Sequence, residues 1–236
     1  MRENARFASA LPEGAIVLDA GAGDQPYRKL FSHCRYEAAD FEIVDKPYGE
    51  TTYVGDLAAI HVEDERFDAI LFNQVMEHLP DPRKVLVELK RVLKPGGMMM
   101  CTAPLFYEEH ERPYDFYRYT QFGWHHLMRE AGLEVVRLDW MEGYFGTVAY
   151  QLETASRCLP MRPRQIAPGL IGFLATPLML ACKAMFRLLA WLFYALDERI
   201  RYTANGYPKN YVVLVRKHAS IGTEAICYSA QNGRNR

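Results

Sequence analysis

The sequence predicts an α/β fold with a doubly wound, mostly parallel sheet and a hydrophobic helical insertion. Short apolar segments alternate with segments of helical periodicity along most of the chain. This alternation is typical of a parallel sheet that is covered by helices on both faces. The first apolar segment runs directly into a glycine-rich turn, and a long segment without charge interrupts the pattern at residues 166–182.

The composition limits the class of protein. The chain has 236 residues, half of them hydrophobic, which is enough for one large domain with a full core and an insertion. The net charge of −1 argues against a broad nucleic-acid surface, so we expect no nucleic-acid partner. The five cysteines are scattered and form no C-x-x-C pair. We therefore expect no metal site, no disulfide framework and a reduced, cytoplasmic compartment.

Five short apolar segments in the first half of the chain have the length and composition of buried strands. They are residues 15–19, 36–40, 51–54, 67–72 and 98–102. Tyr27, Leu30 and Phe31 have helical spacing, so we expect a helix between the first two strands.

Two longer helices are expected in the middle of the chain. The segment 81–93 begins with Asp-Pro, continues with apolar residues at helical spacing and ends at a Lys-Pro-Gly-Gly sequence. The segment 120–130 begins with a threonine that can cap a helix and ends shortly before a glycine. The last two strands are expected at residues 133–138 and 211–215.

The glycine-rich turn at residues 17–24 has the sequence Val-Leu-Asp-Ala-Gly-Ala-Gly-Asp. Gly21 and Gly23 lack Cβ atoms, so the backbone can turn sharply and approach a nucleotide-type cofactor closely. A dinucleotide fingerprint would have a third glycine where this chain has Pro26. This difference argues against a nicotinamide-dependent oxidoreductase, which stays an alternative.

Further motifs follow that turn in a fixed order. They are Gly-Asp-Leu at 55–57, Asn-Gln-Val-Met-Glu-His-Leu-Pro-Asp-Pro at 73–82 and Leu-Lys-Arg-Val-Leu-Lys-Pro-Gly-Gly at 89–97. With these motifs the chain resembles the class I S-adenosylmethionine-dependent methyltransferases over roughly residues 15–140. The resemblance implies a Rossmann-like sheet of seven strands with one antiparallel strand, for which 211–215 is the candidate.

The resemblance also implies which residues bind S-adenosylmethionine. Asp19 would lie near the methionine portion, Asp40 would accept hydrogen bonds from the ribose hydroxyls, and Asp56 would take the adenine amine. The full set of expected cofactor-binding residues is Asp19, Gly21, Gly23, Asp40, Phe41, Asp56, Leu57 and Asn73. Each acid also has a plainer interpretation, as a helix cap, a turn residue or a surface carboxylate.

A second dense motif lies at residues 103–120, after the fifth strand, and is rich in aromatic and charged residues. It resembles the His-x-x-Pro-x-Asp-x-x-Arg-x-Thr loop of a methyltransferase subgroup associated with cell-envelope and glycan pathways. A hydroxyl acceptor needs a base, and His110 is the first candidate, with Asp115 and His78 as the others. The resemblance also implies that Glu77 and His78 line the acceptor pocket. Alternatively, His110, Asp115 and Arg118 form a network that only orders the loop, and Glu77 and His78 are solvated or capping residues.

The uncharged segment 166–182 is followed by another apolar run at 188–196, and glycines and prolines are expected to break up its first half. Basic residues flank both runs. Residues 166–196 therefore fit a peripheral membrane contact or lipid groove, a buried cap or homodimer interface, or a transmembrane span. We expect a cofactor-binding methyltransferase domain over 1–142 and 205–217, a helical hydrophobic insertion over 143–204, and a flexible tail over 218–236.

Together, these observations predict an S-adenosylmethionine-dependent methyltransferase that acts on an oxygen of a small-molecule, glycan or lipid-linked acceptor. We expect it in the cytoplasm, with peripheral contact at the inner face of the membrane. A membrane-associated scaffold that binds the cofactor without turnover is the non-enzymatic alternative.

Overall fold

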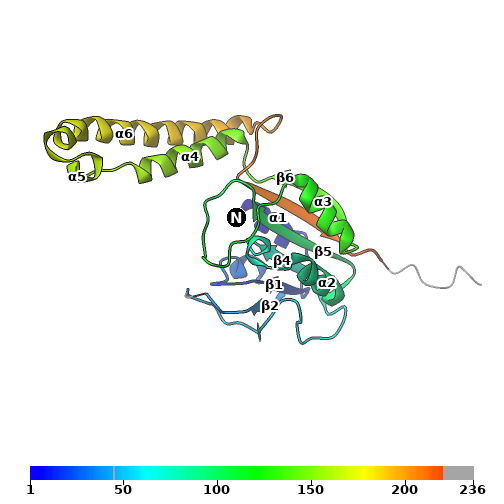
Figure 1. Ribbon diagram of the computed structural model, residues 1–236. Helices are drawn as coiled ribbons and strands as arrows, with labels where there is room; N and C mark the ends of the chain where they lie inside the picture. Colours follow the sequence, from blue (N-terminus) through cyan, green and yellow to red (C-terminus); the bar gives the residue numbers. More distant parts are fainter. Residues whose placement is uncertain (45, 220–236) are drawn as a thin grey trace, which may run out of the picture.

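The computed structural model describes residues 1–44 and 46–219 and contains one seven-stranded sheet (Figure 1). The order of the strands across the sheet is β3-β2-β1-β4-β5-β7-β6, and β7 runs antiparallel to both of its neighbours while the other pairs are parallel. The strands are β1 Ile16–Ala20, β2 Arg35–Asp40, β3 Tyr53–Val54, β4 Phe67–Asn73, β5 Leu93–Pro104, β6 Glu134–Trp140 and β7 Asn210–Arg216. The predicted fold class, including the one antiparallel strand, is confirmed.

The helices pack on both faces of this sheet or extend away from it. They are α1 Arg2–Ser9, η1 Arg28–Phe31, η2 Met76–His78, α2 Pro82–Val92, α3 Gln121–Glu130, α4 Tyr144–Cys158, α5 Pro163–Ile166 and α6 Gly169–Ile200, where η marks 3-10 turns. The expected caps are present: Asp81 accepts from the amide of Lys84 at 3.3 Å, and Thr120 accepts from that of Gly123 at 3.2 Å.

The first crossover differs from the prediction. A helix was expected after the glycine turn, but the structure has only the four-residue η1, because the chain enters β2 already at Arg35. The cover on this face comes from α1, which the sequence analysis did not identify. Phe7 of α1 packs against Phe31 of η1 with ring centroids 6.5 Å apart, and both rings belong to the same buried cluster as Val17 of β1.

Helices α4 and α6 pack against each other and form a hairpin that projects away from the sheet, with α5 at its tip (Figure 1). The expected break is present at Pro168 and Gly169, between α5 and α6, but not at Gly172 or Pro177, because α6 is one helix of 32 residues that continues through both. Gly172 serves close packing instead: a Cβ there would lie 2.4 Å from the carbonyl oxygen of Pro163. The glycine thus lets α5 fold back against α6.

The outer surface of α6 is apolar and exposed. Leu170, Phe173 and Leu174 are each at least 70% exposed, and Trp191 is 64% exposed. Helix α6 is long and apolar enough to cross a membrane by length and composition, and only 6% of its most apolar window is buried. The predicted alternative in which this segment caps the protein's own core is therefore wrong.

Candidate functional site

A cleft of about 310 Å³ opens at the carboxyl ends of the parallel strands β1 to β4. Crevices at this edge of an open α/β sheet are the usual ligand sites. The residues that line it come from the turns after these strands and from the loop at 105–120: Gly21, Asp40, Phe41, Ile43, Val44, Lys46, Tyr48, Asp56, Leu57, Gln74, Val75, His78, Leu79, Pro80, Glu111, Tyr114 and Phe116. The structure thus brings five of the expected cofactor residues together with His78.

The glycine turn after β1 requires its glycines for two different reasons. Gly21 has φ +76°, and a Cβ at this position would lie only 2.3 Å from Cγ2 of Val75. Gly23 has φ +52°, but a Cβ there would meet no protein atom within 4 Å. Gly21 is therefore needed for packing inside the protein, whereas Gly23 keeps an open space beside the turn.

Asp40, at the end of β2, is held in place by two backbone amides. Its Oδ2 accepts from the amide of Gly23 at 2.8 Å, and its Oδ1 accepts from the amide of Glu42 at 3.0 Å. Because each carboxylate oxygen has two lone pairs, Asp40 can still accept ligand hydroxyls. The ring of Phe41, which is 49% exposed, lines the cleft next to it.

Asp56 and Leu57 follow β3 and also line the cleft. Oδ1 of Asp56 accepts from the amide of Ala58 at 2.9 Å, which fixes the carboxylate at the start of the next turn. The side chain of Leu57 is buried beneath it and presents an apolar surface. A carboxylate can accept hydrogen bonds from an amine on the edge of an aromatic ring system, and an apolar side chain beside it can contact the face of the ring.

Asp19 lies in β1 and is almost fully buried, outside the residues that line the cleft. The hydroxyl of Tyr36 donates a hydrogen bond to it. Burial raises the pKa of Asp19 to about 7; the bond from Tyr36 opposes this shift, and the charge of Asp40 adds to it. A buried carboxyl with this pKa is poised to ionise when a cationic group approaches.

Asn73 is placed differently from the other expected residues. Its Nδ2 donates to Oδ1 of Asn4 in α1 at 2.8 Å, and its Oδ1 accepts from Thr102 at 3.2 Å. The neighbouring Gln74, with φ +54°, lines the cleft instead and donates to Thr102 at 3.0 Å. Asn73 therefore ties α1 to the sheet, a long-range contact that a local sequence motif does not indicate.

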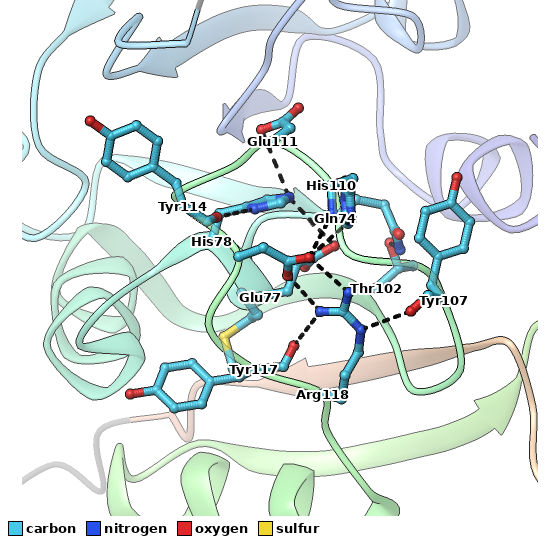
Figure 2. A network of polar contacts seen from close by, with 12 residues as sticks. Gln74, Glu77, His78, Thr102, Tyr107, His110, Glu111, Tyr114, Tyr117 and Arg118 are labelled. Carbon is cyan, nitrogen blue, oxygen red and sulfur yellow. Dashed lines mark hydrogen bonds and ion pairs between the residues drawn. The ribbon is translucent and has the colours of Figure 1, made fainter.

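The loop at 105–120 is organised by Asp115 and Arg118. The guanidinium of Arg118 donates to Oδ1 and Oδ2 of Asp115 at 2.6 and 2.8 Å, and the amide of His110 donates to Oδ2 at 2.8 Å. Arg118 also donates to the carbonyl of Glu108 at 3.1 Å. Figure 2 shows its further bonds to the carbonyls of Tyr117, at 2.9 Å, and Tyr107, at 3.4 Å. The guanidinium holds the pKa of the Asp115 carboxyl well below its usual range, so Asp115 orders the loop and is poorly suited to be a base.

His78 and His110 meet edge to face, with ring centroids 4.7 Å apart. Nδ1 of His78 contacts the carbonyl oxygen of Tyr114, and Nδ1 of His110 lies 3.1 Å from that of Glu108. Figure 2 shows both rings between the segment after β4 and the 105–120 loop. Burial lowers the pKa of His78, which favours its neutral form.

Glu77 is fully buried beside these histidines. Its backbone carbonyl accepts from the amides of Phe116 and Tyr117 at 2.8 and 3.3 Å, which joins η2 to the 105–120 loop. Neither carboxylate oxygen has a hydrogen-bond partner among residues 1–44 and 46–219, and burial raises the pKa of this group to about 8. From the sequence, Glu77 was expected either to line the acceptor pocket or to be a solvated or capping residue; its burial is visible only in the fold.

Lys46 and Glu111 close one side of the cleft. Nζ of Lys46 lies 2.8 Å from Oε1 of Glu111, so an ion pair joins the loop after β2 to the 105–120 loop. Neither residue was singled out from the sequence, because each lies in an irregular segment. The pair connects the part of the cleft with the expected cofactor residues to the part with the histidines.

Residues 1–138 match a family model described as a methyltransferase domain. This chain belongs to that methyltransferase family. The match begins before α1 and ends within β6, so it includes all four strands whose ends form the cleft. The expectation of an S-adenosylmethionine-dependent methyltransferase is confirmed for the family, and the nicotinamide-dependent oxidoreductase is wrong.

Two curated relatives are similar over part of this chain. A tRNA (carboxymethyluridine(34)-5-O)-methyltransferase of Arabidopsis thaliana is 31% identical over 105 residues, which is 42% of this chain and 26% of that protein. A ubiquinone biosynthesis O-methyltransferase of Maricaulis maris is 33% identical over 102 residues, which is 38% of this chain and 40% of that protein. This chain thus matches well under half the length of either relative.

Solved structures share the fold at lower identity. Phosphoethanolamine N-methyltransferase 2 of Haemonchus contortus, solved with S-adenosyl-L-methionine, has a TM-score of 0.54 at 14% identity, covering 92% of this chain and 52% of that one. The [4+2]-cyclase SpnF has a TM-score of 0.53 at 14% identity, covering 91% and 81%. Because one of these two is a cyclase, the fold alone does not fix the reaction.

Proposed function

We propose that this protein transfers a methyl group from S-adenosylmethionine to an oxygen atom of a small-molecule, glycan or lipid-linked acceptor. The observation that carries the proposal is the single cleft that joins Asp40 and Asp56 to His78. S-adenosylmethionine supplies an electrophilic methyl group when it is bound. The residues of the chain have to hold this cofactor, position the acceptor and take up its proton.

The chemistry of the donor set fits the cofactor. The carboxylate of Asp40 suits the ribose diol, and that of Asp56, beside the apolar Leu57, suits the adenine amine. The open space at Gly23 leaves room for close backbone approach. The buried carboxyl of Asp19 suits the cationic amino group of the cofactor, because a nearby positive charge favours its ionised form.

The acceptor side favours oxygen. A hydroxyl must lose its proton during methyl transfer, and His78 and His110 provide two imidazoles next to the cleft. Both of their Nδ1 atoms lie against backbone carbonyls, which leaves Nε2 of each ring as the acceptor of a proton. The names of the two curated relatives also specify O-methylation.

Calorimetric titration with S-adenosylmethionine, S-adenosylhomocysteine and NAD tests the cofactor assignment. We expect both sulfur nucleotides to bind, NAD not to bind, and Asp40→Ala to weaken binding at least tenfold. Glu13→Gln, a change at an exposed acid away from the cleft, is the control. Binding without turnover on any acceptor of a glycan and lipid panel would instead support the scaffold alternative.

Helix α6 supports a second part of the proposal, peripheral contact with an anionic membrane from the cytoplasmic side. Its outer surface is apolar, and the exposed side chain of Arg187 lies within it, with Arg162 and Arg199 near the two ends of the helix. A spanning orientation would place Lys183 and Arg187 in the hydrocarbon. A helix along the surface keeps these charges at the headgroups while its apolar side chains enter the lipid.

Flotation with liposomes tests the membrane contact. We expect the protein to float with vesicles that contain an anionic lipid, and to float less with neutral vesicles or at high salt. Replacing Leu170, Phe173 and Leu174 with glutamine should abolish flotation, whereas Phe122→Gln, at an exposed position of α3, should not. No flotation at low salt together with a dimer by light scattering would favour a homodimer interface instead.

A further inference from the structure

We propose that Glu77, His78 and His110 form a binding site for one divalent transition-metal ion. Each of the three offers one ligand atom, and these atoms all lie within 4.8 Å of one another. They come from two segments, η2 and the 105–120 loop, that are far apart in the sequence. The inference goes beyond the proposed function and reverses the expectation of no metal that the sequence alone supported.

Both histidines have Nδ1 against a backbone carbonyl, which leaves Nε2 as the nitrogen that can bind an ion. Nδ1 of His78 lies against the carbonyl oxygen of Tyr114, and Nδ1 of His110 lies 3.1 Å from that of Glu108. A carbonyl can only accept, so Nδ1 carries the proton in each ring and Nε2 keeps its lone pair. Metal-ligating histidines are typically oriented by such a contact of the other nitrogen.

Glu77 provides an independent observation. Its side chain is fully buried, and both carboxylate oxygens lack a hydrogen-bond partner in the part of the chain that the structure describes. A buried, unpartnered carboxyl group is costly and therefore uncommon. Its Oε1 lies 3.8 Å from Nε2 of His78, so a cation between them would satisfy the carboxylate.

The surroundings add negative charge to the same place. Oε2 of Glu111 also lies 3.8 Å from Nε2 of His78, while its Oε1 pairs with Lys46. The nearest guanidinium, that of Arg118, is engaged by Asp115 and by backbone carbonyls rather than by Glu77. Among the described residues, Lys46 therefore compensates Glu111, whereas no cation pairs with the carboxylate of Glu77.

The ligand set selects the class of ion. Two imidazoles and one carboxylate suit zinc, and the same set also occurs around iron and manganese. Magnesium and calcium prefer sites made of oxygen atoms and should bind poorly. Three protein ligands leave coordination positions for water or for an acceptor oxygen.

His78 also lines the cleft, so the ion would lie at its acceptor end. A bound ion lowers the pKa of a coordinated hydroxyl, so with the ion in place the acceptor would release its proton to solvent, and Nε2 of each histidine would hold the ion instead of taking up that proton. This consequence rests on the proposed methyl transfer. Ion binding itself does not, and it can be measured without any acceptor.

Titration of chelator-treated protein with zinc, followed by calorimetry and by competition with a chromophoric chelator, tests the site. We expect one zinc ion per chain, at least tenfold weaker binding in His110→Ala and in Glu77→Gln, and little binding of magnesium. His125→Ala, which changes an exposed histidine of α3, is the matched control and should bind zinc as the wild type does. Cobalt substitution should give visible absorption bands that both site variants lose.

The variants must be shown to be folded, because Glu77 is buried. Unchanged S-adenosylhomocysteine binding and circular dichroism would show this for His110→Ala and Glu77→Gln. The proposal is overturned if the wild type binds no zinc, or if the folded variants bind it as tightly as the wild type. Zinc binding without methyl transfer would leave the site standing and contradict only the proposed function.

Discussion

The amide of Gly23 donates a 2.8 Å hydrogen bond to Oδ2 of Asp40, so the acid that ends β2 also fixes the turn that follows β1. The two strands are parallel neighbours in the sheet, and their carboxyl ends therefore lie side by side. The carboxylate of Asp40 thus fixes the backbone of the turn after β1 and can still accept hydrogen bonds from a ligand. Substitutions in this turn should consequently separate effects on folding from effects on binding.

Gly21→Ala and Gly23→Ala form a pair that tests this separation. At Gly21 the new Cβ would lie 2.3 Å from Val75, so we expect a loss of at least ~2 kcal/mol in the free energy of unfolding. At Gly23 the Cβ meets no protein atom, and the cost should be about 1 kcal/mol from the positive φ alone. Urea denaturation measures both values.

Cofactor affinity should respond differently from stability, because Gly23→Ala, the substitution with the smaller cost in stability, should weaken binding. We expect Gly23→Ala to weaken S-adenosylhomocysteine binding at least tenfold, because its Cβ would enter the space kept open beside the turn. If Gly23→Ala binds as tightly as the wild type, the cofactor does not approach this backbone. Ala22, whose side chain is already buried, shows that the turn accepts a Cβ where space exists.

Asp19 should make stability depend on pH. Its pKa is about 7 in the folded protein, against 3.8 for the group when exposed, so between these values the folded chain holds a proton that the unfolded chain has lost. Stability should therefore fall as the pH rises from about 4 to 7, by up to ~4 kcal/mol, and level off above 7. Urea denaturation of the wild type and of Asp19→Asn at pH 5 and pH 8 measures this slope.

Asp19→Asn cannot ionise and should lose the part of this pH dependence that Asp19 contributes, whereas the part from Glu77, whose pKa burial raises to about 8, should remain. An equal slope in both proteins would assign the effect to other groups. Binding of the cationic cofactor should in turn release a proton from Asp19 near neutral pH, because a nearby positive charge favours the carboxylate. Calorimetry in two buffers of different ionisation enthalpy detects this release.

Much of this site could be predicted from the sequence because it follows strand ends. Gly21, Asp40 and Asp56 lie at the end of a parallel strand or within two residues of it, and parallel strands place such residues at one edge. The bond between Asn73 and Asn4 could not be predicted, because it joins two residues 69 positions apart. The continuity of α6 through Pro177 was missed because local propensity is a weak guide where tertiary packing, here against α4, supports a helix.

The arrangement of the residues on the acceptor side could not be predicted from the sequence either. The motif around His110 was visible, but its geometry depends on how the 105–120 loop folds over η2. Asp115 looked like a candidate base until the structure showed both of its oxygens engaged by Arg118. Similarly, nothing in the local sequence indicates that Glu77 is fully buried.

The ion pair between Lys46 and Glu111 should slow the release of bound cofactor. Both side chains are partly exposed, 34% and 27%, so the pair should contribute less than ~1 kcal/mol and be screened by salt. We expect Lys46→Glu to raise the dissociation rate of S-adenosylhomocysteine by up to about fivefold in stopped-flow measurements at low salt. The swapped double variant Lys46→Glu with Glu111→Lys should restore the rate, and failure to do so would show that the charges act separately.

Arg118→Ala should disorder the 105–120 loop without unfolding the sheet. The side chain of Asp115 is only 4% exposed, so removal of its partner leaves a buried charge without compensation. We expect proteolytic cleavage within the loop to become much faster and methyl transfer to be lost, whereas S-adenosylhomocysteine affinity changes less than threefold. Arg112→Ala, in the same loop, removes only an exposed pair with Glu109 and should change none of these quantities. If Arg118→Ala leaves the loop protected from protease, the order of the loop comes from other contacts, such as the bonds of Phe116 and Tyr117 to the carbonyl of Glu77.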